Sequence, residues 1–172
     1  MTKLHRLFIV ASATALFVLI SQGGFAHGAE RGNAKATIGG AHVTIDYGRP
    51  LLNGRDPVKM LKPGQVWRIG ADASTTIESD KDLDFGGTKV PKGKHILLAQ
   101  LDESGKWSLV VSSKSWNQYE SSAKIAAVPL TLDEAPNSAE SVTIELSGQG
   151  GEGTVVISWG KMRLSGSFKV AG

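Results

Sequence analysis

Apolar and polar residues alternate in short runs along most of the chain. Val43, Ile45 and Tyr47 occupy every second position of one run, and the runs 142–146 and 155–159 repeat this spacing. Alternation with a period of two is typical of β-strands that bury one face and expose the other. Glycine-rich turns separate these runs, so the pattern predicts antiparallel strands joined by short hairpins.

Roughly ten short strands and almost no helix are expected from this pattern. Both alternating sets of side chains are largely apolar in the run 95–101, which predicts a central strand covered on both faces. A single helical turn is expected over 58–61, because Asp56-Pro57 supplies an N-cap residue and a first helical position. The expected strands cover 35–38, 42–47, 81–85, 88–90, 95–101, 107–112, 124–132, 142–146, 155–159 and 168–170. Together these elements predict an all-β fold, a single-domain antiparallel β-sandwich.

The N-terminus has the layout of a secretory signal peptide. Lys3 and Arg6 precede an apolar run over 7–20, and small and polar residues follow as far as Ala26. The apolar run is shorter than the about 20 residues that a membrane-spanning helix needs. A signal peptide over 1–26, cleaved near Ala26, is therefore expected rather than a membrane anchor.

The remaining chain is expected to form a disordered leader over 27–34 and the β-sandwich domain over 35–172. Cleavage after Gly28 or Ala29 is the alternative to cleavage after Ala26. The mature protein is then periplasmic or secreted, without insertion into the membrane. Because the chain has no cysteine, no disulfide stabilises the fold and no lipid-modified cysteine anchors the protein to a membrane.

The charge balance argues against a nucleic-acid partner. The whole chain has 19 lysines and arginines and 16 acidic residues, but Lys3 and Arg6 belong to the expected signal peptide. Subtracting these two leaves 17 basic residues against the same 16 acidic residues, since residues 1–26 contain no acid. Nucleic-acid binding usually requires a clear excess of positive charge.

The motifs that would indicate a cofactor, a metal or a nucleophile are weak. Residues 148–153 have the spacing of a dinucleotide-binding loop, but the run 154–157 reads as a strand, whereas such a loop must open a helix. We therefore expect a hairpin loop there and no cofactor. His42 and His95 have no paired spacing and there is no cysteine, so no metal site is expected. No serine lies in a nucleophile motif, so no catalytic residue is assigned.

The stretch 64–79 carries most of the residues that could form a site. If it is extended, Trp67 and Ile69 share one face, and Arg68 projects from the other. An arginine beside an aromatic ring can stack on it and bind a carboxylate or phosphate through its planar fork. For Arg68 and Arg49 the alternative is an internal ion pair that pins a loop, and the candidate partners are Asp46, Asp56 and Asp72.

Several ordered motifs resemble those of a bacterial family of exported proteins catalogued as domain of unknown function 2911. These motifs are 45–50, 53–55, 66–71, 79–82, 86–87, 90–93, 107–111 and 116–118, and they extend over nearly the whole mature chain. The family's tyrosine-x-arginine-proline signature falls on Tyr47, Arg49 and Pro50. Its tryptophan-arginine-x-glycine-alanine signature falls on 67–71. The resemblance implies no established activity.

Two departures from the family pattern disfavour an enzyme. Ala73 stands where members usually have a glutamate, and His95 stands where they tend to have a tyrosine. If either family residue were catalytic, this protein would have lost it.

The sequence thus favours an uncharacterised exported protein that is a non-catalytic binding or structural module of the cell envelope. Its expected partner is a small molecule or an envelope component. The alternatives are a periplasmic hydrolase that uses Arg49, Arg68 and Asp72, and a carbohydrate-binding module that stacks sugars on Trp116 and Tyr119. The residues expected to contact a ligand are Tyr47, Arg49, Trp67, Arg68, Asp72, Thr75, His95 and Trp116.

Overall fold

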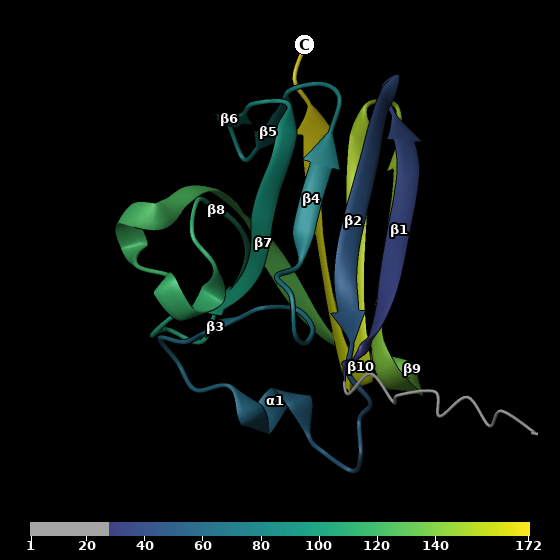
Figure 1. Ribbon diagram of the computed structural model, residues 1–172, viewed down its shortest axis with the longest axis vertical. Coiled ribbons are helices and arrows are strands. Elements are labelled where there is room, and N and C mark those ends of the chain that lie inside the picture. The colour runs from purple at the N-terminus through teal and green to yellow at the C-terminus, as the bar shows by residue number, and fades with distance from the viewer. Residues whose placement is uncertain (1–27) are drawn as a thin grey trace, which may run out of the picture.

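The computed structural model describes residues 28–172, and the expected signal peptide lies outside them (Figure 1). In this part of the chain ten strands form one open antiparallel sheet, in the order β1-β2-β4-β7-β8-β9-β10-β5-β6, with β3 paired to β7. The strands are β1 (Glu30–Ile38), β2 (Ala41–Arg49), β3 (Val66–Trp67), β4 (Thr76–Ser79), β5 (Leu83–Phe85), β6 (Thr88–Val90), β7 (Gly93–Leu101), β8 (Trp107–Ser112), β9 (Lys124–Gln149) and β10 (Glu152–Val170). The predicted all-β antiparallel class is confirmed.

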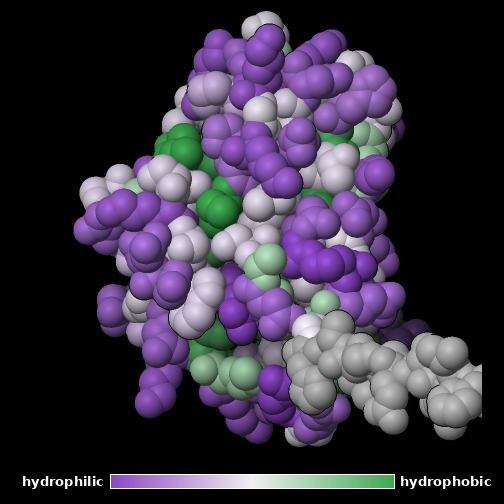
Figure 2. Space-filling view, in the orientation of Figure 1, coloured by the Kyte–Doolittle hydropathy of each residue, from purple (hydrophilic) through white to green (hydrophobic). Residues whose placement is uncertain are grey.

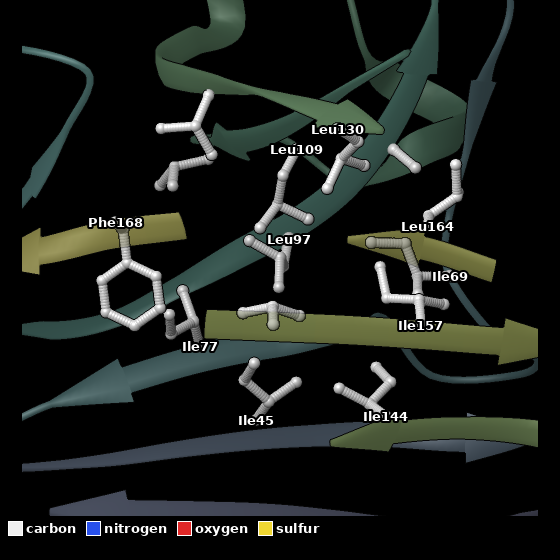
Figure 3. Close-up of a cluster of buried hydrophobic side chains, with 14 of the residues drawn as sticks. Ile45, Ile69, Ile77, Leu97, Leu109, Leu130, Ile144, Ile157, Leu164 and Phe168 are labelled. Carbon is white, nitrogen blue, oxygen red and sulfur yellow. The ribbon is translucent and has the colours of Figure 1, made fainter. Parts of the chain in front are cut away.

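The sheet folds over so that its two halves face each other around one core. Figure 3 shows Ile45 and Leu97, from the half that contains β2 and β7, beside Ile144, Ile157 and Phe168 from β9 and β10. All five side chains are nearly excluded from solvent. Burial of such side chains on inward-facing alternate positions is the main source of stability in a layered β fold.

Strand β7 lies between β4 and β8, as the sequence predicts for a strand that is apolar on both faces. Its residues Leu97, Leu98 and Ala99 are all buried, although neighbouring side chains of a strand point to opposite faces. Leu97 and Ala99 belong to the main core, whereas Leu98 points to the outer face. Both faces of the sheet are therefore covered at this strand.

The first hairpin forms where it is expected, but it is longer. The turn is Gly39-Gly40, with φ of 53° and 75°, a conformation that favours glycine. Strand β1 starts at Glu30 and keeps an unbroken register with β2 as far as Arg49. The interpretation of residues 30–34 as part of a disordered leader is therefore wrong, because β2 provides backbone partners along that whole length.

The last four expected strands are in fact two long ones. Strands β9 and β10 pair with each other through the Gly150-Gly151 turn, with register shifts between Ser158, Gly160 and Met162. Such irregularities let a strand bend without ending. The polar stretch between 133 and 141 lacks an apolar alternation, so the hydrophobic pattern made one bent strand look like two.

The expected loop over 148–153 is a hairpin connection, with only Gly150 and Gly151 outside the strands. A side chain on Gly148 or Gly153 would collide with the core. An added Cβ would lie 2.6 Å from Ile38 Cγ1 at the first position and 2.7 Å from Phe168 Cζ at the second. The glycines thus serve close packing between strands, and no helix follows them.

The helical content is small. Helix α1 (Pro57–Met60) forms the expected single turn, and two 3₁₀ turns, η1 (Trp116–Gln118) and η2 (Ser121–Ala123), occupy the expected polar loop between β8 and β9. Within residues 28–172 no helix is long and apolar enough to cross a membrane.

Candidate functional site

The tyrosine-x-arginine-proline motif lies against the free edge of β9. The Tyr47 hydroxyl accepts a hydrogen bond from the Ile144 amide at 3.1 Å and faces the carbonyl oxygen of the same residue at 3.5 Å. The Val142 amide donates to the Pro50 carbonyl at 3.2 Å. Arg49 Nε donates to the Val142 carbonyl at 3.3 Å. These are edge groups of β9 that no strand within residues 28–172 pairs, so the motif satisfies buried backbone atoms.

Arg49 makes two further contacts beside this edge. Its Nη2 donates to Ser141 Oγ at 2.9 Å, and its Nη1 lies 3.3 Å from Glu30 Oε2. Its ion-pair partner is therefore Glu30 rather than one of the three aspartates expected from the sequence. We call residues 47–52 the edge clasp, because Leu51 also forms an isolated bridge with Ser141.

The two signature motifs meet through their glycines. A Cβ on Gly48 would overlap the carbonyl oxygen of Ala71, and a Cβ on Gly70 would lie 2.7 Å from the carbonyl oxygen of Gly48. The backbones of the edge clasp and of the stretch after β3 therefore touch directly. Only glycine allows two backbones to approach this closely.

The stretch after β3 is a tight turn rather than the extended segment considered from the sequence. Ile69 and Asp72 have φ of 53° and 60°, and the fully buried Ile69 is β-branched, a residue type that rarely adopts this conformation. Thr75 is buried, and its hydroxyl donates to the Ile69 carbonyl at 2.9 Å. Asp72 is exposed and accepts a hydrogen bond from the Ala29 amide. Thr75 thus holds the turn, and Asp72 ties it to the start of the described chain.

Trp67 packs against the core, as expected for an anchor, although it is half-buried. Its ring stacks on Trp159 of β10, with centroids 5.8 Å apart and an interplanar angle of 9°. The Arg55 guanidinium lies 5.0 Å from the centroid of the same Trp159 ring. Sequence reasoning placed Trp159 on an alternating strand and Arg55 in a turn motif, but it linked neither of them to Trp67.

Arg68 faces away from this stack and meets a different aromatic ring. Its guanidinium carbon lies 5.1 Å from the centroid of the Trp116 ring, while its Nε donates to the Gly70 carbonyl at 3.2 Å. Trp116 is 43% exposed, so part of its ring faces solvent. We call the pair Arg68 and Trp116 the cation–indole surface. Arg68 thus has the aromatic partner that the sequence suggested, but the contacts of Arg49 and those of Arg68 have no residue in common.

Tyr119, on the same loop as Trp116, is half-buried. Burial raises the pKa of its phenol, because desolvation disfavours the charged phenolate. Tyr119 therefore offers less accessible ring surface than Trp116 does.

The histidines have local roles. His95 Nε2 lies 2.8 Å from the Pro91 carbonyl oxygen, so this nitrogen carries the proton and ties the residue to the turn before β7. His42 lies at the start of β2, and its Nδ1 is 2.8 Å from Asp80 Oδ2. This hydrogen bond is the main cause that lowers the pKa of the Asp80 carboxyl. Both side chains of the second pair are exposed.

The main surface hollows in the described residues lie away from both signature motifs. One lies between the β5–β6 hairpin and strands β9 and β10, and another lies beside α1. Hydrophobic side chains reach the face drawn in Figure 2 as small separate areas on a mostly hydrophilic surface. Among residues 28–172, no three or more histidine and carboxylate side chains are arranged to hold a metal ion.

A family model described as "Protein of unknown function (DUF2911)" matches residues 29–168. The match spans the edge clasp, the cation–indole surface and nearly all of the strands. No curated protein and no solved structure matches the chain.

Proposed function

The chain belongs to the DUF2911 family of proteins of unknown function, and we propose that it is a non-catalytic binding module exported to the bacterial envelope. The proposal rests on how the polar side chains of the first signature and of the turn after β3 are used. Tyr47 and Arg49 bond to the edge of β9, and Thr75 bonds to a turn carbonyl. Side chains that hold buried backbone groups in this way stabilise the fold and are poorly placed for chemistry on a substrate.

A hydrolase that uses Arg49, Arg68 and Asp72 fits this geometry less well. Arg49 donates a hydrogen bond to the Val142 carbonyl of β9. Arg68 lies over the Trp116 ring, and Asp72 accepts a hydrogen bond from the Ala29 amide. General acid–base chemistry needs its groups within hydrogen-bond reach of one reacting point. These three residues point to three different neighbours.

The cation–indole surface is the place where a ligand would bind. It combines a 43% exposed indole with a guanidinium whose Nη atoms make no protein hydrogen bond within residues 28–172. An exposed indole gives a flat apolar surface on which the C–H face of a sugar ring packs, and the guanidinium supplies donors for oxygen atoms. This arrangement favours an envelope glycan as the ligand, the carbohydrate-binding alternative drawn from the sequence, with Trp116 rather than Tyr119 as its platform.

Isothermal titration with soluble oligomers of N-acetylglucosamine and of glucose tests this proposal. Trp116→Ala is expected to weaken binding about tenfold or more, as is usual for an aromatic anchor at the centre of a contact. Leu132→Ala is the matched control, because Leu132 is 40% exposed but lies on β9. Binding that is absent from every glycan, or unchanged by Trp116→Ala, would contradict the proposal. Chromatography of the same mixtures would reveal cleavage products if the protein were a hydrolase.

Export is tested separately by fractionation of a bacterial host. The charged and apolar N-terminus predicts a periplasmic or secreted species that lacks about 26 residues. Full-length protein retained in the inner membrane would overturn this part of the proposal.

A further inference from the structure

The two ends of the sheet differ in length and in protection. Strand β6 forms one end and has three residues, whereas β1 forms the other end and has nine. All nine residues of β1 pair with β2 without a register shift, and β1 contains no proline. Short strands, bulges, prolines and charged side chains are the usual devices that keep a sheet edge from pairing with another chain. Of these, strand β1 has only the charged side chains of Arg31 and Lys35, so its backbone edge stays long and regular.

The two-residue turn determines which residues of β1 have backbone amides and carbonyls that point away from β2. Ile38 and Ala41 flank that turn and form a hydrogen-bonded pair, so bonding to β2 falls on even-numbered residues. The amides and carbonyls of Arg31, Asn33, Lys35 and Thr37 therefore point away from the sheet. Within the described chain, β1 pairs with β2 alone, and the last three of these residues have exposed side chains.

The free edge of β9 shows, for comparison, how the backbone groups of a strand edge can be paired within this fold. At the free edge of β9, the groups of Val142 and Ile144 receive hydrogen bonds from the edge clasp. The outer backbone groups of β1 receive no such hydrogen bonds from residues 28–172, although Cα atoms of β9 lie within 8 Å of β1. In Figure 1, β1 is the outermost strand on the side away from β7.

We propose that β1 pairs with β1 of a second copy of this chain, antiparallel and around a twofold axis at Ala34. The axis makes the contact self-complementary, so that the pairing closes as a dimer. Asn33 lies opposite Lys35 of the second copy, and Arg31 lies opposite Thr37 of the second copy. All four residues on each strand then use their outward backbone groups.

Charge selects this register over its neighbours. A shift of the axis to Lys35 would place the two lysines opposite each other, and a shift to Asn33 would place Arg31 opposite Lys35. Like charges directly opposite each other destabilise an antiparallel pair. The register centred on Ala34 avoids both arrangements and keeps small residues, Gly32 and Ala36, at either side of the axis.

Sedimentation velocity over a micromolar to millimolar range tests the dimer. The protein is used as the cell produces it, with its N-terminus determined by mass spectrometry. The wild-type protein is expected to shift from monomer to dimer as its concentration rises. Asn33→Lys is expected to weaken this dimer, because it places a second cation opposite Lys35, and Asn33→Asp is expected to strengthen it.

The symmetry doubles each effect, because every substitution occurs twice in the dimer. The dissociation constant is expected to change by about twofold to thirtyfold in each direction. Thr131→Lys is the matched control, because it adds the same charge at an exposed position of β9. Lys35→Pro removes an outward amide and is expected to abolish the dimer, with circular dichroism confirming the fold.

Three results would overturn the proposal. The first is a protein that stays monomeric throughout the range. The second is a dimer with the same affinity in all Asn33 variants, which would use another surface. The third is growth beyond the dimer that the Asn33 variants do not change, because a twofold contact closes on itself.

Discussion

Two arginines of the family signatures have opposite surroundings. Arg49 bonds to the backbone of β9, to Ser141 and to Glu30, and it helps close one side of the fold. Arg68 bonds to the carbonyl of Gly70 and stacks over the exposed Trp116. The same residue type therefore serves as a buried-edge donor in one motif and as part of an exposed surface in the other.

This difference teaches that a signature residue need not be a site residue. The edge clasp exists because the sheet folds over and leaves β9 with unpaired groups, whose burial without partners would be costly. The cation–indole surface satisfies no such requirement, since Trp116 remains 43% exposed. A ligand site is better sought among side chains whose contacts are not needed to stabilise the fold.

The largest expected effect is the difference in stability between replacing Trp159 and replacing Trp116, the two tryptophans whose rings lie against an arginine guanidinium. Trp159 is 3% exposed and lies between strands of the core, so Trp159→Ala is expected to cost about 3–5 kcal/mol of unfolding free energy. Trp116→Ala is expected to cost about 1 kcal/mol or less, since an exposed cation–π contact contributes about that much. Urea unfolding measures both. Equal losses would show that Trp116 is part of the core and would break the comparison.

The next effect concerns the hydroxyl of the edge clasp. Tyr47→Phe removes the acceptor of the buried Ile144 amide, and an unsatisfied buried group costs about 1–3 kcal/mol. Tyr119→Phe is the control, because burial alone raises the pKa of the Tyr119 phenol and no hydrogen bond from the described part of the chain contributes to that shift. Chemical denaturation of both variants gives the difference. A Tyr47→Phe protein as stable as the control would show that the clasp is not needed to close the fold.

A smaller effect is expected at Arg68. Arg68→Gln removes the charge over Trp116 and is expected to reduce stability by about 1 kcal/mol or less. Tryptophan fluorescence should change at the same time, because the indole loses a stacked neighbour. If Arg68→Gln proves as damaging as Trp159→Ala, Arg68 is a structural clasp like Arg49.

The smallest effect is the pH dependence of the exposed contact between His42 and Asp80. Its hydrogen bond lowers the pKa of Asp80 below the ordinary value of 3.8. The folded-state pKa is lower than the unfolded one, so the stabilisation is present above pH 3.8 and disappears as the pH falls through the folded value. Thermal melts of wild-type and Asp80→Asn protein should differ slightly above that range and converge below it. A difference that grows on acidification would have the wrong sign.

Much of the fold could be predicted from hydrophobic spacing, because strand alternation is a local property. The hairpin at Gly39-Gly40, the central strand β7 and the single turn α1 all lie where the pattern places them. The long strands β9 and β10 were missed, because bulges and a polar stretch interrupt the alternation. The early start of β1 was missed because the polar residues 30–33 are ordered by pairing with β2.

The candidate site was only partly predictable. The sequence identifies Arg49, Trp67 and Arg68 as residues with unusual chemistry, and it allows Arg68 an aromatic partner. It could not identify Trp116 as that partner, because 47 residues, 69–115, lie between Arg68 and Trp116 in the chain. It likewise could not show that Arg49 and Tyr47 bind the backbone of β9, which is more than 90 residues away.

By itself, the sequence determined the all-β class, the position of several strands and turns, and which residues carry charge or aromatic rings, because these properties depend on neighbours along the chain. The tertiary structure alone decided which edge is closed and which stays open. That choice depends on how the sheet folds over, since closure brings Tyr47 and Arg49 to β9 and, within residues 28–172, leaves the outer edge of β1 unpaired and Trp116 exposed. Backbone groups that become buried, as at β9, need protein partners, whereas groups that stay in contact with water do not.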